Sequence, residues 1–257
     1  MTKHPSNFIW YDLMTTDIAA ASAFYADVVG WKITDAGMPG MSYSILKAGA
    51  IDVGGMMAAP TDMPASETHP HWNGHIYVSD VDAYSKRAVK AGGRIDREPA
   101  DIPGIGRFCV IADPHGAKFI MFKPNISEAR TKVADGTQGY IGWRELYAGN
   151  LNEALDFYSG LFGWTKGTSM DMGAMGIYQL FQIEGKDAGG MMKKMDSRPV
   201  ATWGYYFNVS GIDAGAARIT KTGGKISMGP HQVPGGRWIV NATDPQGAFF
   251  SLLSEVK

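Results

Sequence analysis

The chain of 257 residues carries 24 basic side chains against 25 acidic ones, and 45% of its residues are hydrophobic while 19% are charged. This composition indicates a folded globular protein without the basic excess that binding to nucleic acid requires. No run approaches the roughly 18 apolar residues of a membrane span, the first residues do not resemble a secretory signal, and the single cysteine, Cys109, excludes an internal disulfide and a cysteine-based zinc site. We therefore expect a cytoplasmic monomer or homodimer whose partner is a small molecule, not nucleic acid or a membrane.

The sequence is duplicated. When Trp10–Trp31 is aligned with Trp143–Trp164, seven of 22 positions are identical, whereas chance would give about one or two. Shorter runs also return: Gly-Gly-Met-Met at 54–57 and 189–192, and Asp-Pro-His-Gly-Ala at 113–117 as Asp-Pro-Gln-Gly-Ala at 244–248. We expect two homologous domains, residues 1–126 and 140–257, joined by a polar linker at 127–139.

Each half is doubled again. In chain order, strand-like segments start at residues 10, 75, 143 and 206. Seven residues later stands an Asp or Asn that favours a helix start, and a glycine then ends each helix. The predicted caps are Asp17, Asp82, Asn150 and Asp213, and the predicted stops are Gly30, Gly92, Gly163 and Gly223. Strand-like runs follow, at 43–47, 108–112, 118–122, 178–183, 238–242 and 249–253. The pattern predicts an α+β fold of four β-α-β-β-β modules.

Several repeated residues are typical of structural roles. Asp113 and its counterpart Asp244 begin Asp-Pro turns and are expected to form them. The glycine pairs at 54–55 and 189–190 indicate a bulge or a close approach of strands. Trp31 and Trp164 end helices that must pack on the sheet, so we expect them in the core.

Four such modules, a helix ending in Phe-Tyr and Gly-Trp, and the Asp-Pro-x-Gly-Ala turn resemble the vicinal oxygen chelate superfamily, which includes glyoxalases, bleomycin-resistance proteins and dioxygenases. The tandem form is similar to glyoxalase-like antigens of mycobacteria. The resemblance implies that modules pair, each pair forming a curved mixed sheet that encloses a cup. Whether modules one and two pair with each other, or across the duplication, stays open.

The resemblance also implies where a metal would bind. In metal-dependent members the ligands come from the first strand of a module, usually His, and from its last strand, usually Glu. Here the first-strand positions hold Trp10, His75, Trp143 and Tyr206; the last-strand positions hold Ile120 and Ser251, and fall within a residue or two of Met56 and Met191 in the other modules. Only His75 is a good ligand for a divalent ion. We expect no metal, no cofactor and no assigned catalytic residue.

A local metal site is an alternative. His69, His71 and His75 stand within seven residues, and three imidazoles could hold an ion. A polar loop that happens to be rich in His is the favoured interpretation, because no partner carboxylate is apparent in the sequence.

Strand alternation predicts which side chains face the cups. The expected ligand-binding residues are Trp10, Asp12, Met14, Met56, His75, Tyr77, Ile120, Trp143, Glu145, Tyr147, Met191, Tyr206, Asn208 and Ser251. Aromatic and methionine side chains around one acid per cup are typical of small-molecule pockets. Trp10 and Trp143 are equally compatible with simple packing.

Asp12 and Glu145 lie two residues from a Trp on an apolar strand, where an acid is costly unless solvated, paired or used. Pairing with Arg, Lys118 or a backbone amide is the structural interpretation; binding a cationic or hydroxyl-bearing ligand, or acting as a base, is the functional one. We therefore expect a protein that binds a small apolar or aromatic molecule without metal. The alternative is a glyoxalase-like lyase or isomerase, or a dioxygenase, that uses His75 with Asp12 or Glu145 as acid/base or metal ligand.

Overall fold

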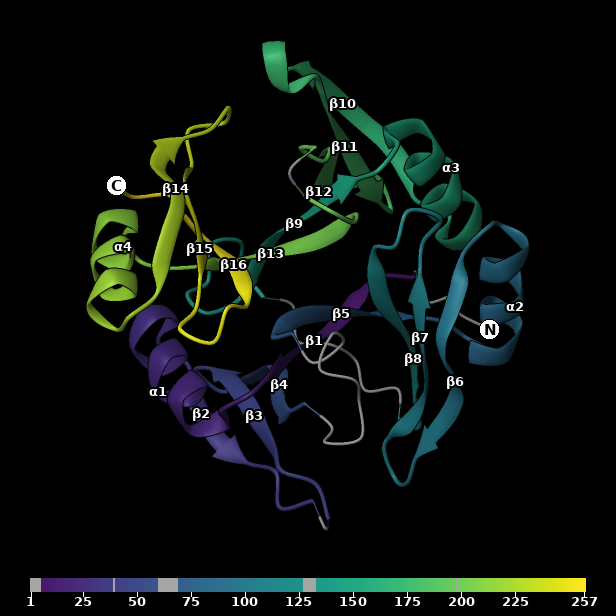
Figure 1. Ribbon diagram of the computed structural model, residues 1–257, viewed down its shortest axis with the longest axis horizontal. Coiled ribbons are helices and arrows are strands. Elements are labelled where there is room, and N and C mark those ends of the chain that lie inside the picture. The colour runs from purple at the N-terminus through teal and green to yellow at the C-terminus, as the bar shows by residue number, and fades with distance from the viewer. Residues whose placement is uncertain (1–5, 39, 60–68, 127–132, 197) are drawn as a thin grey trace. The chain divides into compact units, whose positions relative to one another are not determined.

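The computed structural model describes residues 6–38, 40–59, 69–126, 133–196 and 198–257. It contains the predicted β-α-β-β-β order four times, which confirms the α+β fold (Figure 1). Module one comprises β1 Phe8–Thr15, α1 Ile18–Val29, β2 Lys32–Asp35, β3 Tyr43–Ala48 and β4 Ile51–Ala58. Module two comprises β5 His71–Tyr77, α2 Val81–Lys90, β6 Arg94–Ile102, β7 Gly106–Ala112 and β8 Lys118–Pro124.

The second half repeats this series. Module three comprises β9 Ile141–Ala148, α3 Leu151–Phe162, β10 Thr165–Asp171, the short 3₁₀ helix η1 Gly173–Met175, β11 Ile177–Ile183 and β12 Lys186–Lys193. Module four comprises β13 Thr202–Asn208, α4 Ile212–Lys221, β14 Lys225–Gln232, β15 Trp238–Thr243 and β16 Phe249–Ser254. None of the described helices is long and apolar enough to cross a bilayer.

Each module forms four strands of a mixed sheet. In module one, β1 pairs with β4 in parallel, while β3 pairs antiparallel with both β2 and β4. The other modules repeat the parallel pairing of first and last strands. The strand orders are β2-β3-β4-β1-β5-β8-β7-β6 and β10-β11-β12-β9-β13-β16-β15-β14. Because the first and last strands of a module are neighbours, their side chains on one face lie side by side.

Two of the predicted helix starts are wrong by two residues. α1 and α3 follow Asp17 and Asn150, as predicted. α2 instead follows Asp80, whose side chain accepts from a backbone N–H of the first turn, and α4 is shifted by the same amount. The predicted cap Asp82 lies inside the first turn of α2, and its carboxylate binds Arg107 at 2.7 Å and 2.8 Å. The strand before the helix is therefore shorter in modules two and four.

The described chain divides into two compact units, and each combines modules from both halves. One unit, here the one-four unit, contains residues 10–72, 131–143 and 204–257, and the other, the two-three unit, contains residues up to 9, 73–130 and 144–203. α1 packs beside α4 in the one-four unit, and α2 packs beside α3 in the two-three unit (Figure 1). The helical faces are thus paired across the duplication.

Aromatic rings fill the core of the one-four unit. The ring centroid of Phe207 lies 4.8 Å from that of Trp31 and 4.9 Å from that of Trp72. Trp164 has the same role in the two-three unit, where it stacks on Phe181 at 4.7 Å. Trp31 and Trp164 are each only 3% exposed, so their predicted place in the core is confirmed.

A buried Trp-Tyr-Asp chain joins side chains of three modules within each unit. The indole of Trp72 donates to the Tyr25 hydroxyl at 3.0 Å, and that hydroxyl donates to the carboxylate of Asp244 at 3.1 Å. In the two-three unit the same chain is formed by Trp203, Tyr158 and Asp113, at 2.9 Å and 3.3 Å. Both aspartates also accept backbone N–H groups of their own turns, which confirms them as turn formers. Burial raises the pKa of both carboxyls.

Candidate functional site

One face of β1 carries the predicted site residues of module one. Tyr11, Leu13 and Thr15 are buried, whereas Trp10, Asp12 and Met14 on the opposite face are half-buried. Two further side chains share this second face: Met57 is the neighbour of Met14 in the ladder, and Tyr43 is the neighbour of Met57 on β3. We call Trp10, Asp12, Met14, Tyr43 and Met57 the module-one face.

A hydrogen-bonded network lies at the centre of the module-one face. The Tyr43 hydroxyl donates to Oδ1 of Asp12 at 2.6 Å. The indole Nε1 of Trp10 lies 2.9 Å from the same carboxylate oxygen and 2.8 Å from the Tyr43 hydroxyl oxygen, so its single N–H is shared between them. Burial, and then the charge of Asp12, raise the pKa of Tyr43. The phenol therefore stays protonated and acts as a donor to the acid.

Two adjacent glycines make this network possible. Gly55 is the ladder neighbour of Asp12, and a Cβ added to it would lie 1.9 Å from the Tyr43 hydroxyl oxygen. A Cβ at Gly54 would lie 2.2 Å from the backbone oxygen of Tyr11. The expected close approach of strands is thus confirmed at Gly54, while Gly55 leaves room for the ring that reaches the acid.

Module three repeats the acid, the phenol and the glycines. Tyr178 donates to the carboxylate of Glu145 at 3.0 Å. A Cβ at Gly190 would lie 2.2 Å from the Tyr178 ring, and one at Gly189 would lie 2.2 Å from the backbone oxygen of Arg144. An acid held by the phenol of the third strand is therefore a property of both odd-numbered modules.

The surroundings of the two acids differ. Trp143, the counterpart of Trp10, packs against the buried cluster of Tyr206, Ile239 and Leu253. The guanidinium of Arg237 lies 5.2 Å from the centre of the Trp143 ring.

Tyr147 occupies the position that Met14 has in module one, and an arginine side chain lies over its ring. The guanidinium of Arg198 lies 4.4 Å from the centre of the Tyr147 ring. Module three thus offers a more closely packed face than module one.

Met56 and Met191 do not share these faces. Met56 is the ladder neighbour of Leu13, is fully buried, and its sulfur accepts from the hydroxyl of Ser22 on α1 at 3.6 Å. Met191 is likewise fully buried beside Leu146. The last-strand residues beside the two acids are Gly55 and Gly190, one residue earlier in each case.

In module two the structure brings three predicted residues together. His75 is the ladder neighbour of Ile120, and both are buried. Tyr77 is the neighbour of Phe122, whose ring meets the His75 imidazole edge-on with centroids 5.7 Å apart. This face is mainly apolar around one imidazole.

In module four the predicted residues are tied into the fold. Tyr206 is the ladder neighbour of Ser251, whose hydroxyl donates to the side-chain oxygen of Asn241 at 2.9 Å. The side-chain amide of Asn208 donates to the backbone oxygen of Thr137 at 3.2 Å. The side chains on this part of the sheet are all buried: Tyr206, Asn208, Asn241 and Ser251.

The donor set at the first-strand and last-strand positions does not fit a divalent metal. An indole does not coordinate, the Ser251 hydroxyl is used on Asn241, and Ile120, Gly55 and Gly190 offer no side-chain donor. Over residues 6–38, 40–59, 69–126, 133–196 and 198–257, no three His, Cys, Asp or Glu side chains come together as metal ligands would.

The local alternative, His69 with His71 and His75, is likewise not among groups of potential metal ligands in the described part of the chain. Nδ1 of His71 lies 2.6 Å from the backbone oxygen of His69.

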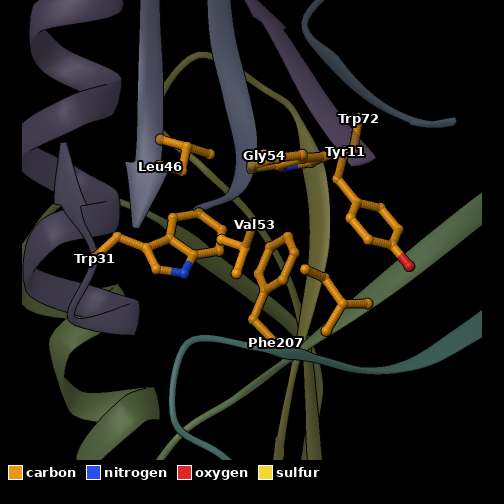
Figure 2. Close-up of a pocket in the computed structure, with 8 residues that line it drawn as sticks. Tyr11, Trp31, Leu46, Val53, Gly54, Trp72 and Phe207 are labelled. Carbon is orange, nitrogen blue, oxygen red and sulfur yellow. The ribbon is translucent and has the colours of Figure 1, made fainter. Parts of the chain in front are cut away.

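Figure 2 shows a pocket deep in the one-four unit, among Trp31, Val53, Trp72 and Phe207. These side chains point toward one another, and the gap between them has no room for a water molecule. It is a packing seam in the aromatic core and does not lie on the module-one face.

Tyr43, Tyr178 and Met57 are site residues that sequence reasoning missed. A signal was available, because Tyr43 and Tyr178 are 135 residues apart, the same spacing as the two Gly-Gly-Met-Met runs. A tyrosine that repeats in register with a glycine pair indicates a ring lying across the glycine.

Comparison with known proteins agrees with this architecture. The relative "Putative glyoxylase CFP32" of Mycobacterium tuberculosis is 34% identical over 95% of this chain and 93% of its own length. "Anthracycline biosynthesis protein DnrV" of Streptomyces peucetius is 29% identical over 95% of this chain and 91% of its own.

Solved structures share the fold at low sequence identity. The Mn(II)-bound glyoxalase from Novosphingobium aromaticivorans aligns with a TM-score of 0.67 at 19% identity, over 98% of this chain and 83% of its own. The 2,2',3-trihydroxybiphenyl 1,2-dioxygenase from Sphingomonas wittichii aligns with a TM-score of 0.69 at 11% identity, over 98% and 91%. The model of one family matches residues 7–121 and again residues 140–252. With both halves matched, the chain belongs to the Glyoxalase/Bleomycin resistance protein/Dioxygenase superfamily.

Proposed function

We propose that this protein binds a small, largely apolar or aromatic molecule without the help of a metal. The observation that carries the proposal is the module-one face, where an indole, a phenol and two thioethers surround one half-buried carboxylate. Few polar anchors in an apolar setting are typical of small-molecule sites. The donor set at the family's metal positions supports the metal-free part of the proposal.

Each component has a physical role in this proposal. The Trp10 ring offers a flat apolar surface for stacking, and the unbranched Met14 and Met57 side chains adapt to an irregular ligand. Tyr43 and Trp10 fix the carboxylate of Asp12 in one orientation. A fixed acceptor can orient a ligand that carries a hydroxyl or an N–H group.

The other predicted ligand-binding residues remain part of the proposal where they share a face with Asp12 or with His75. The two domains, at 1–126 and 140–257, and a place in the cytoplasm are proposed with it. One relative supports an aromatic ligand: DnrV is named for anthracycline biosynthesis, and anthracyclines are planar polycyclic aromatic molecules.

Metal analysis and calorimetry test the proposal together. The purified protein is titrated with planar aromatic quinones and naphthols before and after dialysis against EDTA. We expect binding that EDTA does not change. Asp12→Asn should weaken it about tenfold, which corresponds to about 1.4 kcal/mol. Asp52→Asn is the matched control, since Asp52 is in the same module but exposed and paired with Lys47. A stoichiometric divalent ion that is lost together with binding or activity would overturn the proposal.

A second candidate is supported by the relative named as a glyoxylase at 34% identity. In it the protein is a glyoxalase-like lyase or isomerase, or a dioxygenase, and His75 with Asp12 or Glu145 transfers a proton. The test is an assay of hemithioacetal isomerisation and catechol cleavage with His75→Gln beside the unchanged chain. Turnover that disappears in the variant, while its thermal unfolding stays the same, would favour this candidate over simple binding.

A further inference from the structure

The duplication allows each site position to be compared with its own counterpart. On the first strands of the odd modules, Asp12 and Met14 are half-buried, whereas their counterparts Glu145 and Tyr147 are only 7% and 8% exposed. The other three positions of the face are half-buried in both modules: Trp10 and Trp143 on the first strand, Tyr43 and Tyr178 on the third, and Met57 and Met192 on the last. The difference is therefore confined to the acid and to the residue that follows it on the same face.

The even modules differ in the same direction. Tyr77 and Phe122 of module two are half-buried, but their counterparts Asn208 and Leu253 of module four are buried. The first-strand and last-strand positions follow the same order, since His75 is 7% exposed against 2% for Tyr206, and Ile120 is 8% exposed against 0% for Ser251.

The structure shows what closes the positions of the second half. In module four, Tyr206 packs with Ile239 and Leu253 in a buried cluster that also receives Trp143. The remaining polar groups are used internally, as the hydrogen bond from Ser251 to Asn241 shows. A ligand would have to displace close-packed side chains there, and protein cores resist this because they are packed like crystals.

The module-one face has a different arrangement. Its aromatic and polar groups form hydrogen bonds with one another around Asp12, and five half-buried side chains remain partly open to solvent. The acid in module one is held by two donors, Trp10 and Tyr43. This is a preorganised acceptor at a surface that a ligand can reach.

From these differences we infer that the protein binds one ligand per chain, on the module-one face. The equivalent positions of the second half act as packing. Tyr43 is a positioning residue, because it holds the Asp12 carboxylate and is not needed as the contact itself. This inference rests on the proposed function, but it adds the place and the stoichiometry of binding.

A neutral fluorescent aromatic amine, N-phenyl-1-naphthylamine, serves as the probe for the full-length chain. Its rings suit an apolar face, and its N–H group can donate to a carboxylate. We expect one probe molecule per chain. Asp12→Asn and Tyr43→Phe should each raise the dissociation constant about tenfold. The matched variants Glu145→Gln and Tyr178→Phe should leave it within about twofold. Thermal unfolding is measured for all four.

The outcomes separate this inference from the proposed function. Two probe molecules per chain, or loss of binding in Glu145→Gln with Asp12→Asn unchanged, would overturn the inference and leave the proposed function standing. No binding of the probe, or of the quinones and naphthols, would overturn both. The stoichiometry of the unchanged chain decides between one site and two even where a variant does not fold. Equal loss of binding and of thermal stability in Tyr43→Phe would show that Tyr43 is structural.

Discussion

At the scale of single residues, Gly55 decides whether the acid of module one can be held. A side chain there would occupy the space of the Tyr43 ring, with its Cβ 1.9 Å from the hydroxyl oxygen. The same ring position recurs over Gly190 in module three. A repeated glycine in a strand is therefore explained by the neighbour it admits and needs no unusual backbone conformation.

We expect Gly55→Ala to lower the free energy of unfolding by about 1–3 kcal/mol, because the ring must leave its place. Gly160→Ala is the control. Gly160 lies in α3 with no atom within 4 Å of an added Cβ, so this change should stabilise the protein by about 0.5–1 kcal/mol. Urea unfolding of both variants measures the difference. Equal effects of the two changes would contradict the ring-over-glycine interpretation.

Substitution of Trp10 and of Trp31 should have different effects, because we propose that Trp10 contacts the ligand whereas Trp31 lies in the core. Trp10 is half-buried with its indole N–H on Asp12 and Tyr43, so Trp10→Ala should cost less than about 2 kcal/mol of stability and weaken ligand binding. Trp31 is buried and donates to the backbone oxygen of Gly139 at 2.7 Å, so Trp31→Ala should cost about 3–5 kcal/mol. Chemical denaturation gives both values. If Trp10→Ala unfolds the protein, then Trp10 belongs to the core.

At the scale of elements, the turns after β7 and β15 join modules as well as strands. Asp113 and Asp244 each bind their own turn and a tyrosine of the helix packed beside it. Arg218 of α4 adds a hydrogen bond to the last turn of α1, at 3.1 Å from the backbone oxygen of Val28, and Arg87 does the same from α2 to α3. These contacts specify which helices pack together.

The buried carboxyl of Asp244 predicts a pH dependence of stability. Burial raises its pKa, so the folded chain keeps this proton at pH values where the unfolded chain has lost it. Stability from this group is therefore present at low pH and falls as the pH rises through the folded-state pKa. Asparagine has no such proton. We expect the stability of Asp244→Asn relative to the unchanged chain to increase as the pH rises above about 3.9, the ordinary pKa of an aspartate side chain.

Denaturant unfolding across this pH range provides the measurement. The comparison cancels the contributions of all other titrating groups, since these are common to both proteins. A difference that stays constant with pH, or that falls, would show that the Asp244 carboxyl is not held protonated by burial.

At the scale of the whole molecule, the sequence repeat and the compact units divide the chain at different places. The repeat divides it near its middle, but each compact unit takes one module from the first half and one from the second. Aromatic packing between Trp31 and Phe207 in the one-four unit, and between Phe119 and Tyr158 in the two-three unit, joins modules from the two halves.

This arrangement predicts that the two halves stay associated when the chain between them is cut. A protease site inserted at residues 127–132 should give two fragments that elute together at the size of the whole chain and unfold in the same temperature range. Adding Trp31→Ala should weaken their association, because it removes a core residue shared between modules one and four. Fragments that separate without denaturant would contradict the pairing of modules across the duplication.

The sequence by itself determined the modules and their order. Helix caps such as Asp17, glycine stops such as Gly30, and the repeated Asp-Pro turns are local signals, and local signals depend on residues only a few positions apart. Where the local signal was ambiguous, as with two aspartates in Val-Ser-Asp-Val-Asp, the predicted helix start was wrong by two residues. The alternation of β1 was sufficient to place Trp10, Asp12 and Met14 on one face.

Only the tertiary structure decided what meets that face and which modules pack together. Tyr43 reaches Asp12 from 31 residues away, and the exact register of β4 against β1 puts Gly55 and not Met56 beside the acid. Tyr25 reaches Asp244 across 219 residues. Such contacts depend on strand register and on helix packing, which periodicity along the chain does not encode. Duplication makes the halves equal in sequence pattern, and packing makes them unequal in how far the side chains beside the two acids are exposed.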